Sequence, residues 1–233
     1  GSCGGQFTAN TMACVAEAIG LALPGTSAIP ATFKEREKTA KLAGKTIMQL
    51  IKNGPKPRDI ITRKSLENAT RIVAASGGST NAALHIPAIA HEAGIDFDLF
   101  DLMKVFKTTP YIANMKPSGK YVAKDLYDVG GVPVLMKALL DGGYLHKNCI
   151  TVTGKTVAQN LKNFKFPKKQ DVVQETKNPI SKSSGMVVLK GSLASQGAVV
   201  KIAGMENLEF IGKARCFDCE EDAFKAVQKK KYK

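Results

Sequence analysis

The chain has 233 residues, 44% hydrophobic and 6% aromatic with no tryptophan, so aliphatic side chains must form its core. Lys and Arg outnumber Asp and Glu by 34 to 20, a formal net charge of +14, but only residues 229–233 form a dense basic run. The length fits one or two globular domains, and the absence of an apolar run of roughly 18 residues argues against a membrane span.

The cysteines are too few, and odd in number, for a secreted disulfide framework. They are Cys3, Cys14, Cys149, Cys216 and Cys219. We therefore expect a reducing, intracellular setting without a membrane partner. The basic charge is also typical of nucleic-acid binders, but no aromatic-plus-basic RNA-binding motif is present. We expect lysine-rich solvated surfaces rather than a nucleic-acid partner.

Apolar residues at helical spacing predict helices through the first two thirds of the chain. The first, over 9–22, has Thr8 or Asn10 as its candidate cap, and Pro24 and Gly25 as its stop. Further helices are expected at 31–53, 65–75, from the 76–81 loop to 93, and at 96–106, 122–127 and 132–140. Between them, the apolar run 109–115 predicts a buried strand. This alternation favours an α/β fold with a parallel sheet flanked by helices.

The sequence changes character after the polar stretch FPKKQ at 166–170. Short β-rich runs follow, and then an amphipathic helix at 220–228. The runs lie at 186–190, 197–204, 208–212 and 214–217. We therefore expect two domains, 1–168 and 169–233, the second being the opening strands of a β-barrel-like domain. Four strands without a partner sheet would leave open edges, so we expect this domain to be truncated.

Two GKT triplets, at 44–46 and 154–156, match the end of the sequence motif of phosphate-binding loops. Such a loop needs a glycine five positions before its second glycine. Those positions hold Thr39 and Cys149, so we do not expect an ATPase.

Four of the five cysteines favour structural roles. Cys216 and Cys219 form a CxxC motif, but no second pair or nearby histidines complete a zinc site, so we expect them to be structural residues at a strand end. Cys14 within a helix and Cys149 beside a strand are expected to be small buried residues.

Cys3 differs because it lies in a glycine-rich loop, GSCGGQF, directly before a helix. Backbone N–H groups and the partial positive charge of a helix start both favour a thiolate. A nucleophile, a cluster ligand and a free thiol all remain open on this evidence.

The glycines of the loop SGGSTN at 76–81 allow the backbone to approach a ligand closely, and the other side chains supply hydroxyl and amide donors. Ser79, Thr80 and Asn81 at a helix start suit a carboxylate or phosphate. The simpler interpretation is helix capping by Ser79 or Thr80. His85, in the following helix, is either a substrate contact or a packed core histidine.

Long segments of the chain resemble the dihydroxy-acid dehydratase family, which is related to the phosphogluconate and sugar-acid dehydratases. The first is GSCGGQFTANTMACVAEAIGLALPG, and others follow in the family's order. They lie at 1–25, 75–95, 116–140, 151–161, 178–204 and 212–227. Within the family, TVTGKT and KPSGKY favour a dihydroxy-acid dehydratase over the sugar-acid enzymes.

The resemblance implies a hydro-lyase that converts 2,3-dihydroxy-3-methyl carboxylic acids into 2-keto acids in valine, leucine and isoleucine synthesis. It implies an iron–sulfur cluster, [2Fe–2S] or [4Fe–4S], and Mg²⁺. It also implies a small dihydroxy-acid substrate, a cytoplasmic location (organellar in a eukaryote) and a homodimer. The alternatives are a sugar-acid dehydratase of the same family and a non-catalytic basic nucleic-acid-binding module.

In this resemblance Cys3 matches one of three cluster cysteines. The other two and the modified lysine and acidic magnesium ligands precede this chain in the family, while the base serine and a further glutamate follow residue 233. We therefore expect an internal fragment, inactive alone, with 1–168 the C-terminal part of the N-terminal domain. Ser79, Thr80, Asn81 and His85 remain candidate substrate contacts by their own chemistry. We expect Cys3 to face the domain interface, near residues 76–85.

Overall fold

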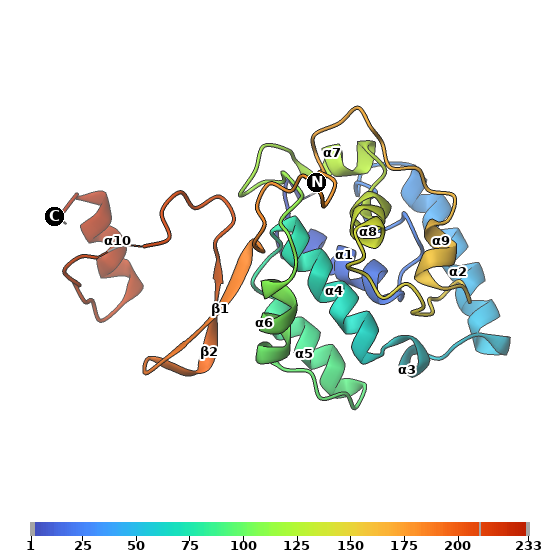
Figure 1. The fold of residues 1–233 in the computed structure, drawn as a ribbon, viewed down its shortest axis with the longest axis horizontal. Coiled ribbons are helices and arrows are strands. Elements are labelled where there is room, and N and C mark those ends of the chain that lie inside the picture. Colours follow the sequence, from blue (N-terminus) through green and yellow to red (C-terminus); the bar gives the residue numbers. More distant parts are fainter. Residues whose placement is uncertain (1–2, 210, 232–233) are drawn as a thin grey trace.

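The computed structural model describes residues 3–209 and 211–231. It is an α/β structure in which a helical body is followed by a small hairpin and a last helix that lies apart from the body (Figure 1). The helices of the body are α1 (Thr8–Ile19), α2 (Glu35–Asn53), α3 (Pro57–Ile60), α4 (Arg63–Ser76), α5 (Ala82–Glu92), α6 (Leu99–Lys107), α7 (Ala123–Asp128), α8 (Val132–Asp141) and α9 (Val157–Leu161). Beyond them come strands β1 (Met186–Gly191) and β2 (Ala194–Lys201), which pair antiparallel, and helix α10 (Glu220–Gln228).

Helix α4 is central to the body and packs against α1, α5, α6 and α8. Its apolar face is fully buried, including Leu66, Ile72 and Val73, and it meets Val15 and Ile19 of α1. Each such aliphatic side chain contributes roughly 1.5–3 kcal/mol on burial, so aliphatic packing stabilises the body without tryptophan, as the composition predicts.

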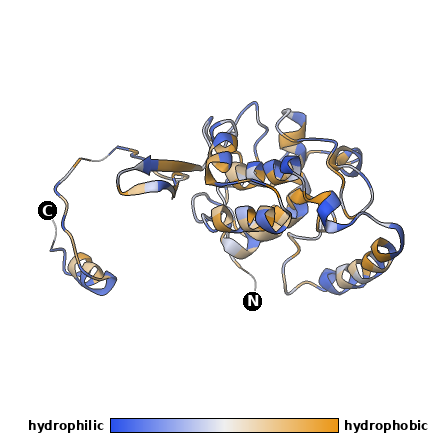
Figure 2. Cartoon of the chain, turned by 90° about the horizontal axis from the view of Figure 1, so that it is seen from below, coloured by the Kyte–Doolittle hydropathy of each residue, from blue (hydrophilic) through white to orange (hydrophobic). Residues whose placement is uncertain are grey.

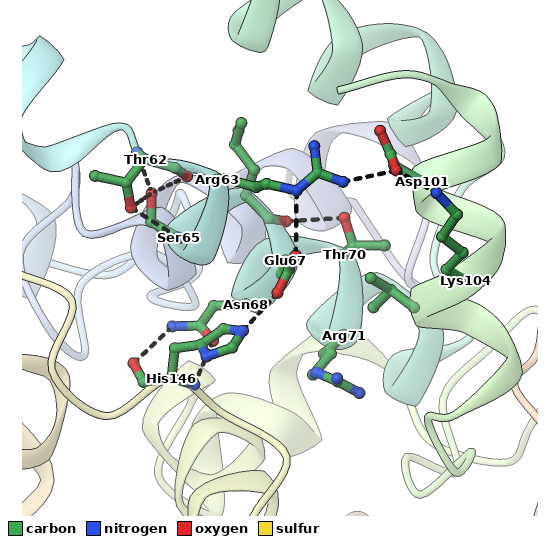
Figure 3. A network of polar contacts seen from close by, with 12 residues as sticks. Thr62, Arg63, Ser65, Glu67, Asn68, Thr70, Arg71, Asp101, Lys104 and His146 are labelled. Carbon is green, nitrogen blue, oxygen red and sulfur yellow. Dashed lines mark hydrogen bonds and ion pairs between the residues drawn. The ribbon is translucent and has the colours of Figure 1, made fainter. Parts of the chain in front are cut away.

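Polar contacts hold both flanks of α4 in place (Figure 3). Thr62 caps the helix start, and Arg63 bonds across to Asp101 of α6, with Nη2 and Oδ1 2.6 Å apart. On the other side, Glu67 Oε2 lies 2.5 Å from His146 Nε2 in the loop after α8. These pairs fix α4 between α6 and that loop, so residues 76–81 at its C-terminal end have a defined position.

The expected helices are present, with shifted ends. Helix α1 ends at Ile19, before Pro24, because Gly20 takes a left-handed conformation with φ of 102°. Helix α2 begins at Glu35 rather than 31, and α6 begins at Leu99, where Asp98 caps it. The short helices α3 and α9 were not predicted.

The expected parallel sheet is not formed within 3–209 and 211–231. The run 109–115 is buried and extended, as predicted, but it makes only single bridges. These join Tyr111 to Ser181, Ala113 to Val173 and Met115 to Tyr121, and only the last is parallel. The physical reason lies at the end of α4, where the Ala75 carbonyl accepts the N–H groups of both Ile112 and Ala113, at 2.9 and 3.1 Å. Donors that a neighbouring strand would need are already used.

The β-rich end is also smaller than expected. The runs 186–190 and 197–204 contribute to the hairpin, but neither 214–217 nor the described part of 208–212 is a strand; residue 210 lies outside the described residues. Leu208 and Ile211 are 67% and 100% exposed. Because nothing buries their side chains, these runs lack the half-buried surface that favours strand pairing.

Helix α2 lies at the edge of the body and buries no residue. Leu42, Ile47, Met48 and Ile51 are exposed on it, and Figure 2 shows hydrophobic residues interspersed with hydrophilic ones along this outlying helix. Within the described residues, no helix has the length and apolarity that crossing a membrane requires.

Candidate functional site

The loop that carries Cys3 is held against the rest of the body by backbone contacts. The Gln6 N–H donates to the Lys116 carbonyl at 2.7 Å. A Cβ on Gly5 would lie 2.7 Å from the same oxygen, so only glycine fits there. Asn10 Nδ2 donates to the Gly5 carbonyl at 2.6 Å and to the Cys3 carbonyl at 3.4 Å. The chain is therefore tied down on both sides of Cys3, while Cys3 itself stays exposed.

The two predicted caps of α1 have other partners. Phe7 occupies the N-cap position, and no side chain caps the helix. The Thr8 hydroxyl lies 3.1 Å from Ser79 Oγ and accepts from Asn81 Nδ2 at 2.8 Å. Thr8 thus bonds to a loop that is distant in sequence, which a local capping rule does not foresee, while Asn10 bonds back to the loop directly before its helix.

Residues 76–81 lie against residues 6–11, which follow Cys3 in the chain, whereas the position of Cys3 at a domain interface stays a prediction. Gln6 Nε2 donates to Ser76 Oγ at 3.1 Å, and the Ser79 N–H donates to Thr11 Oγ1 at 3.0 Å. A Cβ on Gly77 would lie 3.3 Å from the Cβ of Ala203, beyond β2. The start of α1, the end of α4 and the end of the hairpin therefore meet in one region.

A cavity of about 250 Å³ opens beside Cys3. Small side chains of α1 form one wall, the segment 27–31 forms another, and Ala123 with Lys124 completes the lining together with Arg36. The α1 residues are Ala9, Asn10 and Ala13. The cavity joins an exposed thiol to two cationic side chains, an arrangement that suits an anionic ligand.

The candidate substrate contacts do not line this cavity. Ser79 Oγ accepts the Asn81 N–H at 3.2 Å, and the Ala82 and Ala83 N–H groups donate to the carbonyls of Ser79 and Thr80. The hydrogen bonds of the loop are therefore divided between a local turn and α1, and Asn81 is the N-cap residue of α5 without a side-chain cap, so capping by Ser79 or Thr80 is not observed. His85 is exposed and lines a separate, mostly apolar cavity of about 710 Å³. Substrate contact by these four residues stays a prediction.

The remaining cysteines divide into buried and exposed pairs. Cys14 and Cys149 are buried, as predicted, and burial raises the pKa of the Cys14 thiol to about 12. Cys216 and Cys219 are exposed, and Cys219 is the N-cap residue of α10 rather than part of a strand end. The prediction that they lie at a strand end is wrong because the segment 214–217 finds no strand to pair with.

The fit to a metal cofactor can be judged from the donor set. Among the residues that the structure describes, no three His, Cys, Asp or Glu side chains gather to hold a metal ion. Cys3 offers one soft thiol, exposed beside a cavity, which fits one position of an iron–sulfur cluster. No described carboxylate group fits Mg²⁺, which prefers oxygen ligands.

Glu17 lies near the site but was not predicted from the sequence. Glu17 is 3% exposed and accepts the N–H groups of Gly25, at 2.6 Å, and Ser27, at 3.2 Å. The available signal is that Glu17 is the only charged residue of the otherwise uncharged helix TANTMACVAEAI.

Comparison with known proteins gives matches along nearly the whole chain. The family model described as dihydroxy-acid/6-phosphogluconate dehydratase N-terminal matches residues 1–160, and the corresponding C-terminal model matches 171–233. A dihydroxy-acid dehydratase of Pelagibacter ubique is 64% identical over 233 residues, and dihydroxy-acid dehydratase 2 of Bradyrhizobium diazoefficiens is 61% identical; each match covers 100% of this chain. An archaeal relative of the same name, from Metallosphaera sedula, is 52% identical over 99% of the chain. The chain spans 41–42% of the length of these relatives.

Proposed function

The chain belongs to the dihydroxy-acid/6-phosphogluconate dehydratase family, and from this premise we propose that the protein acts as a dihydroxy-acid dehydratase. The reaction is loss of water from a 2,3-dihydroxy-3-methyl carboxylic acid, which gives a 2-keto acid for branched-chain amino-acid synthesis. The observation that carries the proposal is the exposed Cys3 thiol beside a cationic cavity, in a chain 52–64% identical to proteins of that name. The proposal concerns the whole protein, since this chain spans 41–42% of the length of these relatives.

Cys3 is the residue through which this chain would hold an iron–sulfur cluster, [2Fe–2S] or [4Fe–4S]. When bound, the cluster supplies a Lewis-acid iron for the departing 3-hydroxyl. The Asn10 side chain fixes the Cys3 loop because its amide donates hydrogen bonds to the carbonyls of Cys3 and Gly5. Arg36 provides positive potential that attracts the substrate carboxylate into the cavity, where Lys124 is paired with Asp128. Among the described residues no set of side chains is gathered to hold the proposed Mg²⁺.

For residues 79–81 we propose that their main contribution is to position the Cys3 loop. Ser79 and Asn81 both bond to Thr8, two residues before Asn10. Substrate contact by Ser79, Thr80, Asn81 and His85 is proposed as well, and alanine variants that change KM without changing the melting temperature would support it.

We also propose that the protein divides into domains near 168, with a parallel sheet in the first and a β-barrel-like second domain. The separate family models for 1–160 and 171–233 support a division there. In the whole protein, the hairpin would join strands contributed by further chain.

A reducing cytoplasmic compartment and a homodimer complete the proposal. All five cysteines are free thiols, which suits a reducing compartment. The exposed apolar side chains of α2 offer a surface for assembly. Light scattering of the whole protein tests the dimer, and a monomeric mass at micromolar concentration contradicts it.

The test is an anaerobic activity assay of the whole protein. We expect conversion of 2,3-dihydroxyisovalerate to 2-ketoisovalerate, with weaker or no turnover of 6-phosphogluconate. Cys3→Ser should abolish turnover, and the matched variant Cys216→Ser, which changes an exposed cysteine of the C-terminal segment, should retain it. Turnover of 6-phosphogluconate alone would contradict the proposed substrate, and full activity of Cys3→Ser would contradict the role of Cys3.

A further inference from the structure

Glu17 is a buried carboxylate without a cationic partner among the described ion pairs. Its side chain lies inside the body at 3% exposure, and its two oxygens accept the N–H groups of Gly25 and Ser27, with a further hydrogen bond from the Ser27 side chain. Burial of a carboxylate is costly unless specific hydrogen bonds compensate. We therefore expect Glu17 to hold in place a backbone segment whose position is important for the site.

The position of Glu17 on α1 connects it to the Cys3 cavity. Ala9, Ala13 and Glu17 are spaced four residues apart and so follow one face of the helix. The two alanines line the cavity, and their small side chains leave it open. One turn further along, Glu17 reaches the segment that begins at Gly25.

That segment forms the facing wall of the cavity. Oε1 of Glu17 accepts the Gly25 N–H and Oε2 accepts the Ser27 N–H, while residues 27–31 continue directly into the lining. Gly25 has φ of 79°, a left-handed conformation that the hydrogen bond from its N–H helps to maintain. The wall opposite α1 is thus anchored to α1 at one side chain.

We propose that Glu17 is a positioning residue that fixes the segment 25–31 and thereby controls access to the Cys3 thiol and, if the proposed function holds, the affinity for substrate. The corresponding contact on the other side of the cavity is Asn10, which fixes the Cys3 loop itself. Helix α1 therefore sets the width of the cavity through these two polar side chains.

Protonation adds a measurable signature to this geometry. Burial raises the pKa of Glu17 to about 7, against hydrogen bonds from the Gly25 N–H and from the N–H and side chain of Ser27, which lower it. The nearby titratable group is Cys14 on the same helix, a neutral thiol at this pH because its pKa is raised to about 12. Because burial outweighs these bonds, the ionised carboxylate favours an open segment 25–31 in which water reaches it. The wall should therefore be held more firmly at pH 6 than at pH 8.

The first test follows hydrogen exchange in the whole protein, in peptides covering 22–31, at pH 6 and pH 8 after correction for intrinsic rates. We expect the wild type to be better protected at pH 6, and Glu17→Gln to lose about tenfold in protection along with the pH dependence. The matched variant Glu92→Gln, which changes an exposed glutamate of α5, should behave as wild type. Equal protection of Glu17→Gln and Glu92→Gln would overturn the proposal. If Glu17→Gln does not fold, the wild-type profile decides, and the absence of a change in protection between pH 6 and pH 8 would overturn it.

The second test separates this inference from the proposed function. In metal-free protein, we expect iodoacetamide to modify Cys3 several-fold faster in Glu17→Gln than in Glu92→Gln, and equal rates would contradict control of access. In the holoenzyme, Glu17→Gln should raise KM for 2,3-dihydroxyisovalerate more than it lowers kcat. If the variant is active with an unchanged KM, the proposed effect on substrate affinity is wrong. If the wild type is inactive, the proposed function is wrong, and the exchange test alone decides whether Glu17 fixes the segment 25–31.

Discussion

Asn81 Nδ2 donates a hydrogen bond of 2.8 Å to Thr8 Oγ1, which joins the start of α5 to the start of α1. The Thr8 hydroxyl also lies 3.1 Å from Ser79 Oγ, so one side chain connects the Cys3 loop with residues 76–81. The two glycine-rich segments of the sequence thus form one structural unit around the end of α4.

The first prediction follows from this connection. Thr8→Val keeps the shape of the side chain but removes both hydrogen bonds. The Asn81 amide then loses its acceptor, and the Ser79 hydroxyl loses its partner. We expect a loss of about 1 kcal/mol in the free energy of unfolding, the usual size for such bonds. Urea denaturation measures it, with Thr39→Val as control, because the Thr39 hydroxyl bonds only to the preceding turn of an exposed helix. Equal losses in the two variants would show that Thr8 does not connect the loops.

The second prediction concerns the end of α4. Gly77 has φ of 57°, and a Cβ there would lie 2.9 Å from the Tyr111 ring. Gly94 also has positive φ, 73°, but a Cβ would meet nothing within 4 Å. Gly94→Ala should therefore cost roughly 1 kcal/mol for the backbone alone, while Gly77→Ala should cost a further 1–3 kcal/mol for the overlap. Chemical denaturation of both variants checks this, and similar losses would mean that the Gly77 contact is not tight.

The third prediction concerns thiol reactivity. Cys3, Cys216 and Cys219 are exposed, whereas Cys14 is buried with its pKa raised to about 12. At pH 8 only about one Cys14 side chain in ten thousand is a thiolate, the reactive form. In metal-free protein, iodoacetamide should label the three exposed cysteines quickly, and should label Cys14 and Cys149 only on unfolding. Labelling of Cys14 at the rate of Cys216, read by peptide mass spectrometry, would contradict the buried position.

The fourth prediction is a pH dependence of stability. The pKa of Glu17 rises from an ordinary value of 4.5 to about 7 on folding, because of burial. The folded state then binds this proton more tightly than the unfolded state, so its contribution is greatest below pH 4.5 and is lost as the pH rises to about 7. The loss is on the order of 3 kcal/mol. Urea titrations at pH 5 and pH 8 should show a smaller change in Glu17→Gln than in wild type, and equal changes would contradict the raised pKa. Global stability and local order of the segment 25–31 respond in the same direction, because unfolding and opening of this segment both expose Glu17 to water.

Much of the fold follows from local sequence patterns. The spacing of Val15, Ile19 and their neighbours predicts α1 because helical periodicity is a local property, and the apolar run 109–115 correctly indicates a buried, extended segment. Its pairing could not be predicted, because the Ala75 carbonyl that takes its N–H groups lies far away in sequence.

The site shows the same division between local and distant signals. The glycines around Cys3 indicate a special loop, and Gly5 is required by its close approach to Lys116. The partners of Thr8, by contrast, are set by tertiary packing, so a capping rule assigns them wrongly. Glu17 could not be recognised because its burial depends on the segment 25–31 folding back over α1.

The most direct test of the account is the iron content of the whole protein purified without oxygen. If Cys3 is a ligand of an iron–sulfur cluster, Cys3→Ser should lose most of the iron and the visible absorbance of the cluster, while Cys216→Ser should keep both. A Cys3→Ser protein that retains iron and absorbance at the wild-type level would contradict the assignment of Cys3 and the site built around it.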